Sequence, residues 1–92
     1  MIASFADKEA ERLFRTRIAS KRLAPYAEAA LRKLDQVHAA TRIDVLANPP
    51  GNQLKKIEGS DGVWQLRIDQ QHRIRFRWIG SEAHDVEIGD FH

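Results

Sequence analysis

The sequence predicts an α+β fold, in which N-terminal helices pack on one face of a small antiparallel β-sheet. Apolar residues recur with a helical period before residue 48 and with the two-residue period of strands after residue 52. The segment between these patterns, Asn48-Pro49-Pro50-Gly51-Asn52, can continue neither a helix nor a central strand. Because a length of 92 residues suits one core, we expect a single domain over residues 1–92.

Two main helices are expected before the break. The first carries apolar residues at i, i+3, i+4 and i+8, namely Ala10, Leu13, Phe14 and Ile18. The second should begin at Pro25, which is favourable in a first turn, and its apolar stripe comprises Ala27, Leu31, Leu34 and Val37 or His38. Two shorter elements complete this half: a strand near residues 2–5, and a third helix, capped by Thr41, over Ile43, Leu46 and Ala47.

Four alternating runs follow the break, at residues 54–57, 63–69, 72–79 and 83–88. Their short connections predict an antiparallel meander. In the second and third runs, the side chains expected to face the helices are Trp64, Leu66, Ile68, Ile74, Phe76 and Trp78. The opposite face should carry Gln65, Arg67, Arg73, Arg75 and Arg77.

The net charge of +2 hides a basic centre. Residues 51–80 hold six basic and three acidic side chains, whereas residues 81–92 hold four acidic side chains and neither lysine nor arginine. The four arginines of the sheet face, with Lys55 and Lys56 from the first run, can bind phosphate groups, because a guanidinium grips phosphate through two parallel hydrogen bonds. The ordinary alternative is a solvated outer face whose edge lysines discourage aggregation.

The chain ends in Asp90-Phe91-His92, directly after the last predicted strand. A terminal histidine is usually frayed and idle, but Phe91 is expected to pin this tail against the body. Arginines on a sheet, with a histidine and a carboxylate nearby, suit metal-free RNA cleavage, in which the 2′-OH attacks the adjacent phosphate with the help of a base, an acid and cations. DNA lacks the 2′-OH, so the expected substrate is RNA.

Composition excludes several other kinds of site. There is no cysteine, which rules out disulfides and thiolate metal sites. The sequence contains no HExxH pair, glycine-rich phosphate loop or GxSxG turn, so no metal and no cofactor is expected. Charged residues near its start argue against a signal peptide, and no apolar run reaches membrane-spanning length. We therefore expect a cytoplasmic protein without a membrane partner.

Four motifs follow the break in order: Pro49-Pro50-Gly51-Asn52-Gln53-Leu54, Gly62-Val63-Trp64-Gln65-Leu66-Arg67-Ile68, Gln71-His72-Arg73-Ile74-Arg75-Phe76-Arg77-Trp78 and Asp85-Val86-Glu87-Ile88-Gly89-Asp90-Phe91-His92. With the opening Met1-Ile2-Ala3-Ser4-Phe5 and the helical first half, they resemble the HigB-type toxins of the RelE/ParE superfamily, from type II toxin–antitoxin systems. The resemblance covers the whole chain and implies the RelE-like fold.

The resemblance also implies an activity and partners. Such toxins are small, cytoplasmic, metal-independent RNases that cut mRNA in the A site of the 70S ribosome. An antitoxin, here expected to be a helix-turn-helix protein of the HigA type, holds them inactive, and operator DNA is contacted only through the antitoxin complex. By resemblance, Arg73 binds the phosphate, Asp90 and His92 serve proton transfer or positioning, and Phe91 stacks near a base. Lys55 or Lys56 stands where relatives carry histidine, lysine or another polar residue.

Two departures from the family pattern concern the expected site. Relatives commonly end in Asp-Tyr-His, whereas Phe91 lacks the hydroxyl, and many have Lys-Gly where this chain has Glu58-Gly59.

Two other functions remain open on the same fold. One is a ParE-like toxin that poisons a protein target without cutting RNA, and the other is an RNA-binding module without catalysis.

Overall fold

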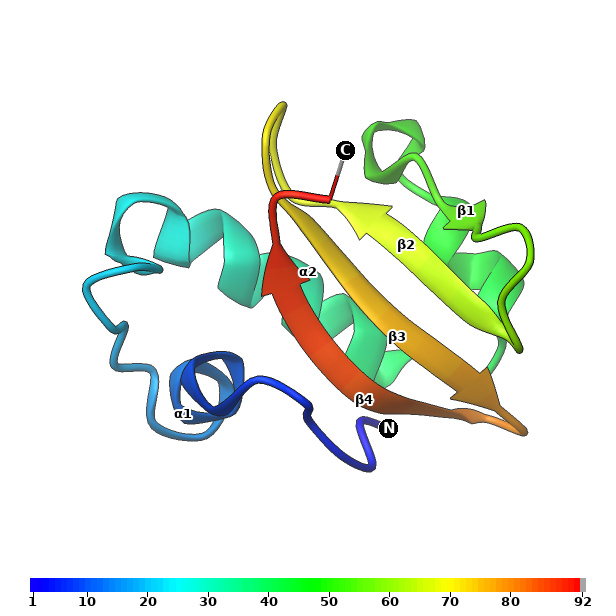
Figure 1. Cartoon of the computed structure of the whole chain (residues 1–92), viewed down its shortest axis with the longest axis horizontal. Coiled ribbons are helices and arrows are strands. Elements are labelled where there is room, and N and C mark those ends of the chain that lie inside the picture. The colour runs from blue at the N-terminus through cyan, green and yellow to red at the C-terminus, as the bar shows by residue number, and fades with distance from the viewer. Residues whose placement is uncertain (92) are drawn as a thin grey trace.

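The computed structural model describes residues 1–91 and confirms the α+β class. Two α-helices, α1 (Lys8–Thr16) and α2 (Ala27–Ala39), are followed by strands β1 (Lys55–Lys56), β2 (Val63–Arg67), β3 (Arg73–Ile79) and β4 (Glu82–Gly89). The strands form one sheet in the order β1-β2-β3-β4, and each neighbouring pair is antiparallel, as the meander requires. In Figure 1, α2 lies behind the sheet, so the face toward the viewer carries no helix.

Helix α1 begins and ends with local hydrogen bonds. The Asp7 side chain caps its start by accepting from the amides of Glu9 and Ala10 at 3.0 and 3.2 Å. At the other end Arg17 adopts a left-handed conformation, with φ of 63°, and its amide donates to the Leu13 carbonyl. The helix therefore ends at Thr16, two residues before Ile18. Ile18 is 54% exposed, so its predicted place in the apolar stripe is wrong.

The first turn of the second predicted helix is a separate 3-10 turn, η1 (Ala24–Tyr26), which contains Pro25. Helix α2 buries Ala30, Leu34 and Val37, so the stripe lies slightly rotated from the predicted one. The third helix is the 3-10 turn η2 (Ile43–Ala47), which buries Leu46, and a further turn, η3 (Pro50–Asn52), precedes β1. No side chain caps η2, so the predicted cap at Thr41 is wrong.

The end of the sheet that follows the β3–β4 turn contains a β-bulge. Arg75 pairs with Glu87 whereas Arg77 pairs with His84, so β4 has one extra residue there, and Asp85 has a positive φ of 53°. The bulge allows Ala83, Val86 and Ile88 to be buried on one face. Strict alternation over residues 83–88, as the sequence predicts, would have placed Ala83 opposite the other two.

The outer edge of β4 is covered by the N-terminal segment and by two charged side chains. Isolated bridges join Ile2 to Ala83 and Phe5 to Val86, in place of the predicted strand near residues 2–5. Farther along the edge, Asp7 Oδ2 accepts from the Ile88 amide at 3.1 Å, and Arg22 Nη1 donates to the Ile88 carbonyl at 2.9 Å. Arg22 also donates to Asp7 at 2.7 Å, so the two side chains act together on the residue that leads into the C-terminal tail.

Substituting Asp7 by alanine is expected to lower the free energy of unfolding at neutral pH by about 2 kcal/mol, because the helix cap and charged hydrogen bonds to Arg22 and Ile88 are lost together. Burial alone would raise the pKa of Asp7, but the hydrogen bonds from Arg22, Ile88 and Ala10 lower the pKa below its ordinary value of 3.8. This stabilisation is present above pH 3.8 and is lost as the pH falls through the lowered folded-state value.

Urea unfolding of the unmodified chain and of Asp7→Ala, repeated from neutral to acidic pH, measures the difference in the free energy of unfolding. The gap in free energy should be widest at neutral pH and shrink below pH 3.8. A gap that stays constant down to pH 2 would show that the Asp7 carboxylate does not provide the stabilisation.

Candidate functional site

Polar and basic side chains gather on the face of the sheet opposite α2. Leu66, Ile74 and Phe76 are buried on the helix side, so their neighbours along each strand point the other way. Strand pairing arranges these neighbours in rows across the sheet. One row joins Lys55, Gln65, Arg75 and Glu87; a second joins Arg67, Arg73 and Gly89. The predicted arginine-lined face is therefore present.

Arg67 and Arg73 are held at the end of the sheet where the C-terminal tail leaves β4. Arg67 Nε and Arg73 Nη1 both donate to the carbonyl oxygen of Asp69, at 3.2 and 2.5 Å, and Arg73 Nη1 also donates to the His72 carbonyl at 3.1 Å. The shared carbonyl offsets the repulsion between two cations that face each other across β2 and β3. Because a guanidinium has five N–H donors, Arg73 retains donors for an anion beyond those used in this turn.

The turn that supplies these carbonyl oxygens is braced on its own. The Asp69 carboxylate accepts from the Gln71 and His72 amides at 2.9 and 2.7 Å, and from the His72 ring at 3.0 Å. Burial alone would raise the pKa of Asp69, but these hydrogen bonds lower the pKa below its ordinary value of 3.8. The His72 ring also stacks on Tyr26, with the ring centres 3.7 Å apart. These contacts give His72 a structural role.

The C-terminal tail turns back over the open face. In Figure 1 it crosses the beginning of β3 toward β2. The Phe91 ring lies 4.4 Å from the Arg75 guanidinium carbon, and it approaches Gly89 so closely that a Cβ there would meet the ring at 2.8 Å. Asp90 accepts from Gln71 Nε2 at 3.2 Å. The expected pinning of the tail by Phe91 is therefore confirmed, whereas His92 lies outside the described residues.

A hollow of about 480 Å³ lies beneath the tail. It is lined by Lys55, Ile57, Glu58, Gln65, Arg75 and Phe91. Its polar lining combines two cations, one carboxylate and one amide with an aromatic ring. A smaller hollow of about 210 Å³, lined in part by Arg75, Arg77, Asp85 and Glu87, lies on the β4 side. Arg75 lines both hollows, so it stands at the middle of this face.

The structure does not bring all the predicted binding residues together. Lys56 pairs with Trp64 on the helix side of the sheet, and its Nζ lies 6.0 Å from the centre of the Trp64 ring. Arg77 lies toward the bulge, where it faces Asp61 at 3.5 Å and Asp85 at 3.7 Å. Lys55, Arg67, Arg73, Arg75, Asp90 and Phe91 form the remaining set around the tail and the larger hollow.

The sequence pattern predicts no role for three residues at this site. The alternation places Gln65 on the open face beside the arginines, Glu58 enters only as a departure from relatives, and Gln71 falls in the connection between two predicted strands. The two-residue alternation could have found Gln65, because it already places this side chain on the same face as the arginines. Gln71 could not be found this way, because its contact with Asp90 joins residues 19 apart in the chain.

Residues 1–91 contain neither a metal site nor a membrane-spanning helix. Within this range, no group of three or more histidine, aspartate and glutamate side chains is arranged to hold a metal ion. None of the helices described in the same range has both the length and the apolar character needed to cross a membrane.

Comparison with known proteins supplies a family for this arrangement. The family model of HigB-like toxins, described as the RelE-like toxin of the type II toxin–antitoxin system HigB, matches residues 3–92. The chain is also similar to Toxin HigB-1 of Vibrio cholerae serotype O1, with 32% identity over 85 residues. The matched region covers 90% of this chain and 90% of that toxin.

Proposed function

Because this chain belongs to the HigB-like family of RelE-like toxins from type II toxin–antitoxin systems, we propose that it is a ribosome-dependent endoribonuclease. In this proposal it acts in the cytoplasm, cuts mRNA in the A site of the 70S ribosome and so inhibits translation. The observation that carries the proposal is the meeting of Arg73, Arg75 and the Asp90–Phe91 tail on one open sheet face. A face of this kind can receive a single RNA strand, with cations for its phosphates and a ring for a base.

The proposed reaction is an internal transesterification. The 2′-oxygen forms a bond to the adjacent phosphorus while the bond from phosphorus to the 5′-oxygen breaks, which leaves a 2′,3′-cyclic phosphate and a 5′-hydroxyl. A base takes the 2′-OH proton, and an acid gives a proton to the leaving 5′-oxygen. Arg73 stabilises the extra negative charge on the phosphorane, and Asp90 and His92 transfer or position the protons. The guanidinium groups supply the positive charge, so the proposed step uses no metal ion.

The other polar residues of the face would hold the strand. Lys55, Arg67 and Arg75 bind neighbouring phosphates, and Phe91 stacks on a base. Lys56 and Arg77 contribute at longer range through their charge, because the structure places one on the helix side and the other near the bulge. The hydroxyl that many relatives have at position 91 takes no part here, since the residue is phenylalanine.

We further propose that a helix-turn-helix antitoxin of the HigA type neutralises this chain and that operator DNA is bound only through their complex. Membership of a type II toxin family supports an antitoxin partner. A partner that binds only the folded toxin also stabilises it. Co-expression with a small helix-turn-helix protein encoded beside this chain should restore growth and yield a complex that co-purifies. Recovery of ribosomes alone, with no small partner, would contradict this part of the proposal.

Brief induction in growing cells, followed by primer extension on abundant mRNAs, tests the activity. The expected result is growth arrest with new 5′ ends at in-frame codon positions. A ParE-like toxin would arrest growth without such ends. A non-catalytic RNA-binding module would bind RNA with a steep dependence on salt and leave it intact. Either outcome would overturn the nuclease assignment.

A further inference from the structure

Gln65 lines the larger hollow, and the activity proposed above gives it no role. It lies on β2 between Lys55 of β1 and Arg75 of β3, and all three line the hollow. The volume of about 480 Å³ falls within the range of roughly 300–1,000 Å³ that is usual for pockets that bind small organic groups. A nucleobase that stacks on Phe91 would lie against this row.

The orientation of the Gln65 amide follows from its neighbour. Arg75 Nε lies 3.0 Å from Gln65 Oε1. A guanidinium nitrogen can only donate, so the amide must turn its oxygen toward Arg75. Arg75 is itself held on its other side by the Phe91 ring. The Gln65 NH2 group makes no hydrogen bond to any residue among 1–91, and it is therefore the group that this amide can offer to a ligand.

The lining of the hollow is thus divided by hydrogen-bonding type. Lys55, Gln65 and Arg75 present donors, whereas Glu58 presents a carboxylate acceptor. Guanine alone among the four bases has two adjacent acceptors, N7 and O6, and on its neighbouring edge it carries the donors N1–H and N2–H2. Adenine carries the N6 amino donor where guanine has O6. An adenine in the hollow would therefore set this donor against the NH2 donor of Gln65.

On the premise that the chain is an RNase, we propose that Gln65 determines specificity by donating its NH2 group to O6 of a guanine held in this hollow. Arg75 fixes the amide in the donating orientation, and Phe91 provides the stacking surface. Glu58 accepts from the neighbouring edge of the base, which carries N1–H and N2–H2. The pocket therefore favours codons with guanine at the corresponding position over the same codons with adenine.

Cleavage by the purified chain on ribosomes programmed with matched codons tests this proposal. The codons differ only by guanine or adenine at the position held in the hollow. The guanine codon should be cut about tenfold faster than the adenine codon. The Gln65→Glu variant keeps the partner of Arg75 but loses the donor, so the ratio should fall to about one while cleavage persists. Gln70→Glu is the matched control, because it adds the same charge at an exposed turn residue and should keep the ratio.

Equal cleavage of all codons by the unmodified chain, or an unchanged ratio in Gln65→Glu, would overturn the assignment of Gln65 while the nuclease proposal stands. Absence of any cleavage would overturn the nuclease proposal, and the pocket is then tested by binding alone. In a titration followed by ¹H–¹⁵N NMR, guanosine 5′-monophosphate should shift the Gln65 side-chain NH2 signals and adenosine 5′-monophosphate should not. Equal shifts, or none, would refute the pocket.

Discussion

Replacement of Arg73 by alanine is expected to reduce mRNA cleavage on the ribosome by about 10²–10³-fold, because a preorganised donor that faces developing phosphorane charge is lost. Arg73 pairs across the sheet with Gly89, the residue directly before the tail, and two backbone carbonyls hold its guanidinium in place. Arg73→Lys should recover only part of the activity, since lysine supplies the charge without the planar pair of donors. The rate of cleavage under single-turnover conditions measures the effect.

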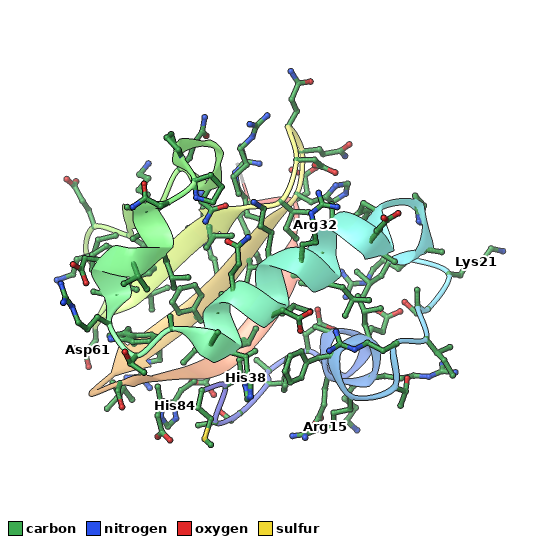
Figure 2. The ribbon with its side chains drawn as sticks, turned by 180° about the vertical axis from the view of Figure 1, so that it is seen from behind. Arg15, Lys21, Arg32, His38, Asp61 and His84 are labelled. Atoms are coloured by element: carbon green, nitrogen blue, oxygen red, sulfur yellow. The ribbon has the colours of Figure 1, made fainter. Side chains whose placement is uncertain are left out.

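The fold should survive this change. Arg73 is half-buried, and its removal also relieves repulsion with Arg67. Arg15→Ala provides a matched control, because Arg15 lies on α1 in an exposed ion pair with Glu11. Figure 2 shows Arg15 on the helical side of the molecule. If Arg73→Ala kept full activity, or if Arg15→Ala lost as much, Arg73 would have no special part in the chemistry.

Replacement of His92 by alanine is expected to reduce cleavage by about 10²–10⁴-fold, the range that a general acid or base contributes. Its neighbours Asp90 and Phe91 are held over the open face by Gln71 and Arg75. With phenylalanine at position 91, no tyrosine hydroxyl can replace the imidazole in proton transfer. A rate that depends on one acid and one base falls at both low and high pH. In the His92→Ala variant, the single-turnover rate should fall on only one of these two sides.

Two outcomes would contradict a catalytic His92. One is an equal loss of rate at every pH, which would indicate a positioning role alone. The other is full activity in His92→Ala. The double variant with Arg73→Ala should lose less than the product of the two single effects, because residues that act on one transition state are not additive.

The alternation of apolar and polar residues was enough to predict β2, β3 and the arginine-lined face that these two strands share. It could not predict the bulge at Asp85, because nothing in the local pattern marks the extra residue that places Ala83 in the core. Helix α1 ends early for a similar reason: Arg17 adopts a left-handed conformation that sequence reasoning assigns first to glycine or asparagine. Local pattern therefore predicted the elements better than their ends and irregularities.

The candidate site was predictable in its residue types and less so in its geometry. Lys55 and Lys56 could be separated only once the register of β1 was known, since that register places one in the hollow and the other over Trp64. The carbonyl oxygens that hold Arg73 depend on the conformation of the β2–β3 turn. Gln65 gains its orientation from Arg75, which is a contact between strands and leaves no motif in the sequence.

The proposed chemistry is tested most directly with mRNA that carries a single 2′-deoxynucleotide at the cleaved position in the A site. Purified toxin and 70S ribosomes programmed with the all-ribose mRNA should give one cut, with a 2′,3′-cyclic phosphate on the upstream fragment. The same mixture with the 2′-deoxy mRNA should give no cut there, because the attacking hydroxyl is missing. Equal cutting of the two mRNAs, or an intact all-ribose mRNA in the presence of ribosomes, would contradict the account.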